Sequence, residues 1–327
     1  MHVQRWDRST EMTRGGGRIL ERWVDYGAGR LAVYDHGGEG TPVLFVHSLG
    51  PCAMTWNYVV PHLGAGVHAY ALDLPGHGHS TVDPTDASDG WRAVEAVARG
   101  LDLDRPLLVA HHLAEHMATV AVRDNPDLFR GLVVLGGEFL LDTEKSREDI
   151  ALALDPGMGE ALRTRFRLGY TGTDPDSARE LVDALVNDSD NDWLLGEMRR
   201  GLRAEVEHSV HIEPDGSWLH KPTLESVLAY FRLPEDSPLL PSPPFYEGLS
   251  VPLRMVHLRD GYESVSPQEA AIVAGHPMLH LAYLDSTAWP QYDKPQETAE
   301  LILAVLEDPD RDDLPTTPEQ AAALARE

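Results

Sequence analysis

The chain has 327 residues, 42% of them hydrophobic, which is enough to bury a sizeable core in one large domain or two smaller ones. Its 27 basic and 53 acidic side chains give a formal net charge of −26, which argues against nucleic acid and anionic membrane surfaces as partners. The lone Cys52 excludes an internal disulfide and fits a reducing cytoplasm, and we expect neither a membrane span nor a secretory signal.

Apolar runs alternate with helical patterns over the first 137 residues. Residues 1–20 are polar, contain three consecutive glycines and are expected to form a flexible leader. Buried strands are predicted for 30–37, 41–50, 66–76, 105–112 and 130–137, and amphipathic helices for 89–103 and 113–125. Strands that alternate with helices favour right-handed βαβ units and a parallel sheet.

This alternation stops near residue 138. Residues 138–245 are helical in pattern, charged and irregular, and this block ends in a proline-rich stretch. The alternation then resumes with predicted strands at 251–261 and 279–286, a helix from Ser266 and a helix at 295–308. We therefore predict a core made of 21–137 and 246–308, a helical lid at 138–245, and an acidic tail at 309–327 with a short helical end.

Four ordered motifs resemble those of the alpha/beta-hydrolase superfamily. They are the oxyanion-loop segment "LFVHSLGPCAMTWNYVVPHL", the turn "DLPGHGHS", the late strand "VPLRMVHLRDGYESVSP" and the segment "STAWPQYDKPQET". The resemblance covers roughly residues 20 to 308. It implies a mostly parallel, doubly wound sheet with a helical lid inserted after the sixth strand.

The same resemblance shows that the usual catalytic triad is incomplete. In "LLVAHHLAEHMA" (107–118), His112 stands where a G-x-S-x-G turn carries its nucleophilic serine. The position of the usual catalytic histidine falls on Ala288, and only Asp260 keeps the expected type, at the acid position. The triad mechanism needs a hydroxyl to attack and an imidazole to accept its proton, so serine-esterase chemistry is not expected.

A histidine at the apex of this turn is a ready general base, because the ordinary pKa of imidazole lies near 6.5. The backbone N–H groups of Leu49 and Leu113 are expected to form an oxyanion hole, which needs only the turn geometry. Asp260 is the first candidate to orient His112, and Glu138 or Asp142 are the alternatives. Ser48, which replaces an oxyanion-loop glycine, His111 and Glu115 are possible auxiliary residues.

This pair of groups suits base-activated hydrolysis of an ester or lactone, and also lyase or cyclase chemistry through an enolate. The expected substrate is a small apolar carbonyl compound, and this mechanism needs neither a cofactor nor a metal ion. A different class of function is a catalytically inactive binding protein that keeps the pocket. A third is a zinc hydrolase, because "HLAEH" (112–116) fits H-x-x-E-H. If Glu115 is buried, it needs a partner, for which His47, His111 and His116 are candidates.

Overall fold

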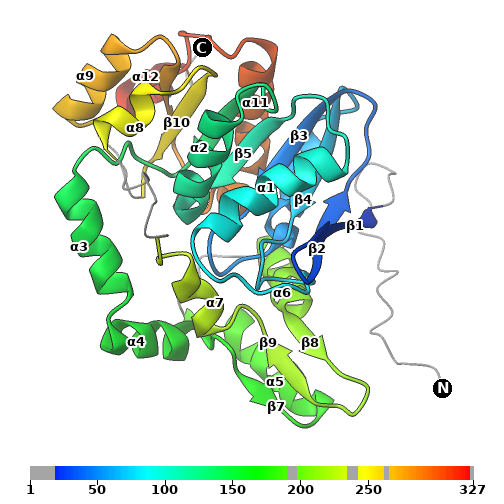
Figure 1. Cartoon of the computed structure of the whole chain (residues 1–327). Helices are drawn as coiled ribbons and strands as arrows, with labels where there is room; N and C mark the ends of the chain where they lie inside the picture. The colour runs from blue at the N-terminus through cyan, green and yellow to red at the C-terminus, as the bar shows by residue number, and fades with distance from the viewer. Residues whose placement is uncertain (1–18, 190–196, 234–241, 261–264, 325–327) are drawn as a thin grey trace.

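An eight-stranded sheet lies at the centre of the molecule in the computed structural model, which describes residues 19–189, 197–233, 242–260 and 265–324 (Figure 1). In spatial order the strands are β1 (Leu20–Tyr26), β2 (Gly29–Asp35), β4 (Val67–Leu72), β3 (Thr41–Val46), β5 (Leu107–His111), β6 (Gly131–Leu135), β10 (Leu253–Leu258) and β11 (Leu279–Leu284). The pairs β1–β2 and β2–β4 are antiparallel, and the other pairs are parallel. The predicted parallel sheet is confirmed.

Helices cover both faces of this sheet, as the nearly continuous apolar runs of its strands require. The helices of the core are α1 (Ser88–Gly100), α2 (Glu115–Asp124), α8 (Pro243–Glu247), α9 (Pro267–Gly275), α10 (Pro290–Asp293) and α11 (Pro295–Glu307). Side chains alternate along β3: Leu44 and Val46 join the core beneath α1 and α2, whereas Val43 and Phe45 join the core beneath α11. Figure 1 shows α1 and α2 on one side of the sheet and α11 on the other.

Strand β1 was not predicted from the sequence. Most of its residues are exposed, so it lacks the apolar run that marks the buried strands. Its backbone pairs along its whole length with β2, which makes it the edge of the sheet. Residues 1–18 of the expected leader lie outside the described residues.

The segment between β6 and β10 is built mainly of helices, as predicted. Its helices before α8 are α3 (Thr143–Ala153), α4 (Pro156–Phe166), α5 (Pro175–Val186), α6 (Glu197–Ser209) and α7 (Leu224–Ala229). Aspartates cap three of them: Asp142, Asp155 and Asp174 each accept backbone N–H groups at the start of α3, α4 and α5. The segment also holds a small antiparallel sheet that the sequence pattern did not predict, made of β7 (Thr171–Gly172), β9 (Trp218–His220) and β8 (Val210–Ile212).

The C-terminal segment follows the outer edge strand of the sheet. The N–H of Tyr283, in β11, donates to the carbonyl of Pro315 over 2.6 Å, and the Arg254 side chain donates to the carbonyls of Pro309 and Arg311. The short helix expected near the end is α12 (Pro318–Leu324). None of the helices in the described ranges is both long and apolar enough to cross a membrane.

Candidate active site

The turn after β5 has the geometry of a nucleophile elbow, with His112 at its apex. The backbone φ of His112 is +47°, in the left-handed region that few residues other than glycine adopt. His112 begins a short 3-10 turn, His112–Ala114, which leads directly into α2. The strand-to-helix turn predicted at this position is confirmed. Such strain, of order 1–3 kcal/mol, is typical of functional sites.

His112 and Leu113 lie at a cavity of about 240 Å³ above this end of the sheet. Its floor comes from the elbow, the start of α2 and the loop after β6, and its roof comes from α3 and the segment after α7. Both residues stay exposed at the mouth of the cavity, with 44% of the Leu113 surface accessible. His112 is therefore open to a small molecule and lies below helices of the predicted lid.

The protein around the His112 ring favours its neutral form. Partial burial of the ring lowers the pKa of His112 below its ordinary value, and no attraction to a carboxylate of the described residues opposes this effect. Near neutral pH the imidazole therefore carries a free lone pair that can accept a proton.

The structure does not bring Asp260 to His112. Asp260 follows β10, its side chain is 54% exposed, and its carboxylate lies 3.3 Å from Nε of Arg259. Its backbone N–H donates to the carbonyl of Ser286 over 3.3 Å. The alternative partner Asp142 accepts the N–H groups of Glu144 and Lys145 and so caps α3. Glu138 lines the cavity.

The loop that would carry a catalytic histidine does reach the elbow. Nε2 of His111 donates to the carbonyl oxygen of Ala288 over 3.0 Å, and the ring of Trp289 lies 5.4 Å from that of His111. Burial lowers the pKa of His111 to about 3, so this histidine is neutral and its Nδ1 carries no proton. Residue 288 thus contacts the residue before the elbow through its backbone carbonyl, and its side chain is only a methyl group.

Leu49 also lines the cavity, so both residues of the predicted oxyanion hole border it. Ser48 is buried, and its carbonyl accepts a hydrogen bond from Nδ1 of His47 over 2.7 Å. Nε2 of His47 accepts the N–H of Leu74 over 3.1 Å. His47 therefore holds the oxyanion loop against the turn after β4.

Glu115 is buried at the start of α2 and lines the cavity. None of the three histidines considered from the sequence is the partner of its carboxyl group. The Tyr246 hydroxyl donates to Oε1 and the Glu138 N–H donates to Oε2, each over 3.3 Å. Tyr246 lies 131 residues further along the chain, and no local pattern could have indicated it.

Burial raises the pKa of Glu115 to about 8 and outweighs the two hydrogen bonds, which lower it. The negative charges of Glu138 and Glu269 raise it further. Glu115 is therefore a neutral carboxylic acid at pH 7.

The H-x-x-E-H pattern does not form a metal site in this geometry. His112 lies at the apex of the elbow and His116 lies inside α2, whereas the zinc pattern needs both histidines on one helical face. In the part of the chain that the structure describes, the possible ligand atoms that converge belong instead to Cys52, Asp73 and His208, within 4.8 Å of one another.

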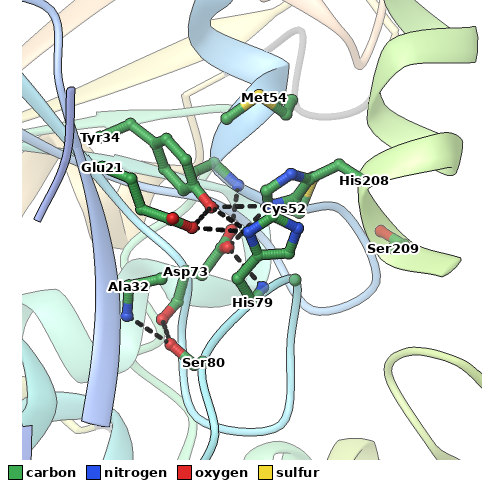
Figure 2. A network of polar contacts seen from close by, with 12 residues as sticks. Glu21, Ala32, Tyr34, Cys52, Met54, Asp73, His79, Ser80, His208 and Ser209 are labelled. Atoms are coloured by element: carbon green, nitrogen blue, oxygen red, sulfur yellow. Dashed lines mark hydrogen bonds and ion pairs between the residues drawn. The ribbon is translucent and has the colours of Figure 1, made fainter. Parts of the chain in front are cut away.

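These three buried residues belong to the network of polar contacts shown in Figure 2. Nε2 of His208, in α6, donates to the Asp73 carboxylate over 2.8 Å, and the N–H of His79 donates to the same oxygen over 2.8 Å. Nδ1 of His79 donates to Glu21 over 2.6 Å, and the Tyr34 hydroxyl also donates to Glu21. The rings of His79 and His208 stack with centroids 3.9 Å apart.

The other oxygen of Asp73 accepts the N–H of Ala53 over 2.7 Å, so both carboxylate oxygens are occupied. Cys52 donates to the carbonyl of Glu205 over 3.6 Å, and the carboxyl of Glu205 binds the hydroxyl of Tyr292. Hydrogen bonds within the protein account for this cluster, which fastens α6 to the core. No local sequence pattern indicates the contact between Asp73 and His208, which lie 135 positions apart.

The comparison with known families settles the relationship of the chain. The model of the family described as "Alpha/beta hydrolase family" matches residues 43–326. The chain belongs to the alpha/beta hydrolase family.

Two curated proteins to which this alpha/beta hydrolase is similar carry hydrolase names. An (E)-2-((N-methylformamido)methylene)succinate hydrolase of Acinetobacter baylyi is 29% identical over 125 residues, which are 37% of this chain and 47% of the relative. A 2-hydroxy-6-oxo-6-phenylhexa-2,4-dienoate hydrolase of Comamonas testosteroni is 25% identical over 214 residues, which are 61% of this chain and 71% of the relative. The chain thus spans about half the length of the first of these relatives.

Solved structures share the fold over nearly the whole chain. The crystal structure of an E-2-(acetamidomethylene)succinate hydrolase has a TM-score of 0.67 and 20% identity, and covers 89% of this chain and 100% of its own. The esterase Rv0045c of Mycobacterium tuberculosis has a TM-score of 0.62 and 22% identity, and covers 89% of this chain and 93% of its own. At this identity, the likeness concerns the fold.

Proposed function

We propose that this alpha/beta hydrolase acts on a small apolar carbonyl compound by general-base catalysis, with His112 as the base. The observation that carries the proposal is that an imidazole, held at φ +47° on the elbow, faces the cavity in place of a serine hydroxyl. The methyl group of Ala288 at the neighbouring loop provides no second base. The hydrolase names of the relatives support the general reaction class.

In this mechanism the substrate carbonyl lies against the backbone N–H groups of Leu49 and Leu113. Neutral His112 takes a proton either from a water molecule that attacks the carbonyl carbon or from a carbon next to the carbonyl. Either step places negative charge on the carbonyl oxygen, where fixed N–H donors lower the energy of the transition state. Base and oxyanion hole thus act together without a covalent intermediate.

The test compares wild type with His112→Gln on a panel of small esters, lactones and ketones, followed by product formation and by proton exchange in D₂O. Glutamine keeps the approximate size of the histidine side chain but cannot accept a proton near neutral pH. The rate should therefore fall by roughly 10²- to 10⁴-fold. His62→Gln, an exposed histidine outside the cavity, is the matched control and should keep the wild-type rate.

The wild-type rate should rise with pH around a midpoint below 6.5, because burial lowers the pKa of His112 and only the neutral ring is active. A rate that is flat from pH 5 to 8, with His112→Gln nearly as active as wild type, would refute the base assignment. That result would leave a pocket that works through substrate binding and its backbone N–H donors alone, without a base at position 112.

A further inference from the structure

The carboxyl group of Glu115 is closely packed at the wall of the cavity. Its carboxyl group packs directly against Gly137, where an added Cβ atom would lie 2.7 Å from Oε2 of Glu115, 2.6 Å from Cγ1 of Val134 and 2.7 Å from Sδ of Met255. Gly137, Glu138 and Glu115 all line the cavity. Only glycine at position 137 leaves room for this carboxyl group at the cavity wall.

The hydrogen bonds around Glu115 leave one hydroxyl proton without an acceptor among the described residues. Tyr246 already accepts the N–H of Leu140 over 3.0 Å and shares one hydrogen bond with Glu115. A neutral Glu115 and the Tyr246 hydroxyl together carry two O–H protons, but only one is needed for the bond between them. Among the described residues no acceptor is present for the second proton, and Glu115 is the member of this pair that lines the cavity.

The electrostatic surroundings keep that proton in place at neutral pH. The charged or titratable groups that face Glu115 are Glu138 after β6, Tyr246 in α8, and Glu269 in α9. Hydrogen bonds from His257 and from the backbone of Ser266 and Phe139 help to lower the pKa of Glu269, which is therefore ionised. Its charge opposes a second negative charge at Glu115.

From this geometry we infer that Glu115 is the proton donor of the site, and that the cavity takes small apolar 1,3-dicarbonyl compounds. The inference rests on the function proposed above. One carbonyl oxygen lies in the oxyanion hole, the other accepts the Glu115 proton, and His112 faces the carbon between them. Trp91, Met117, Ile150 and Phe231 provide apolar walls for the rest of the molecule, and the volume of about 240 Å³ limits it to a small compound.

The reaction step is an enolisation. His112 takes the proton of the central carbon, and the electron pair of the broken C–H bond forms a C=C bond. The π pair of the second carbonyl moves onto its oxygen, which takes the proton of Glu115. Imidazolium and carboxylate remain, and transfer of a proton between them restores the site. The product is the enol, and no oxidant, reductant or leaving group is required.

The experiment follows exchange of the central proton of ethyl 2-methylacetoacetate in D₂O by NMR, as a function of pH. Wild type should show a bell-shaped rate, which rises as His112 loses its proton and falls near pH 8 as Glu115 loses its own. Glu115→Gln should lower the rate at pH 7 at least tenfold and abolish the alkaline fall. Glu144→Gln, an exposed carboxylate of α3 outside the cavity, should change neither limb.

Tyr246→Phe gives a readout that a purely structural role of Glu115 would not produce. Because the Tyr246 hydroxyl lowers the pKa of Glu115, its removal should move the alkaline fall to higher pH. Infrared spectra should show a carboxylic-acid band that titrates near pH 8 in wild type and in His112→Gln. This band should be missing in Glu115→Gln, in which the acid band of Glu205, titrating near pH 7, should remain.

The two proposals fail in different ways. If His112→Gln is inactive but Glu115→Gln keeps the wild-type rate and alkaline fall, the role of Glu115 is refuted and that of His112 stands. Hydrolysis of esters without exchange of the dicarbonyl probe would likewise overturn the assignment of substrate class alone. Exchange that persists in His112→Gln overturns the proposed function.

Discussion

Two regions of this molecule bring imidazoles and carboxyl groups together, and they differ in whether these groups have hydrogen-bond partners. Around Asp73, every carboxylate oxygen has a donor, and the His208 ring binds it over 2.8 Å in a fully buried setting. At the cavity, His112 has no carboxylate partner and Glu115 keeps a proton without an acceptor among the described residues. The close pair of His208 and Asp73 thus has a structural role, whereas His112 and Glu115 line the cavity in which a ligand can bind.

The largest expected effect on stability concerns Asp73. In Asp73→Asn, an amide NH₂ would face the donors of His79 and His208 in place of a charged acceptor. Loss of one partner of a buried pair costs about 3–5 kcal/mol of unfolding free energy. Urea unfolding should show this loss, while Asp104→Asn, at an exposed site, should stay within about 0.5 kcal/mol of wild type. A small loss of unfolding free energy in Asp73→Asn would contradict the structural role that distinguishes the Asp73 region from the cavity.

Glu205, in the same joint, should make stability depend on pH. Burial raises its pKa to about 7, against an ordinary value of 4.5. Its stabilising contribution is therefore complete below pH 4.5 and is lost as the pH rises to about 7, since only the unfolded chain ionises easily in that range. Relative to wild type, Glu205→Gln should gain on the order of 3 kcal/mol between pH 4.5 and 7.

The measurement is the difference in unfolding free energy between wild type and Glu205→Gln at several pH values. Glu207→Gln removes a partly exposed carboxylate from the same helix and is the matched control. A flat difference for Glu205→Gln would mean that this carboxyl group is ionised in the folded protein.

The smallest effect is expected at Asp260. This variant tests whether His112, at the cavity, is independent of that carboxylate. Because its carboxylate is exposed and paired with Arg259, Asp260→Asn should change the rate less than about threefold, the usual range for weak surface pairs. The midpoint of the acidic limb should stay in place in a pH–rate profile. A strong loss of rate with a lower midpoint would instead identify Asp260 as the group that stabilises the His112 imidazolium.

The sequence predicted those features that depend on local pattern. Apolar runs marked the central strands, and the elbow followed from a strand that leads into a helix at His112. Strand β1 was not predicted because an exposed edge strand needs no apolar run. Strands β7, β8 and β9 were not predicted because they are only two or three residues long. The contacts Glu115–Tyr246 and Asp73–His208 join residues 131 and 135 positions apart. Such contacts are set by the tertiary fold, which no short pattern encodes.

The insertion between β6 and β10 has two parts with different attachments. Helix α6 is tied into the core through His208 and Glu205. Helix α3, which supplies the roof of the cavity, buries only Ser146 among its own residues, and α4 after it buries only Gly159. In evolution or in protein engineering, residues 143–166 can therefore be exchanged with less harm to folding than α6. Grafting other helices at this place would change which molecules fit over the elbow while the scaffold beneath is kept.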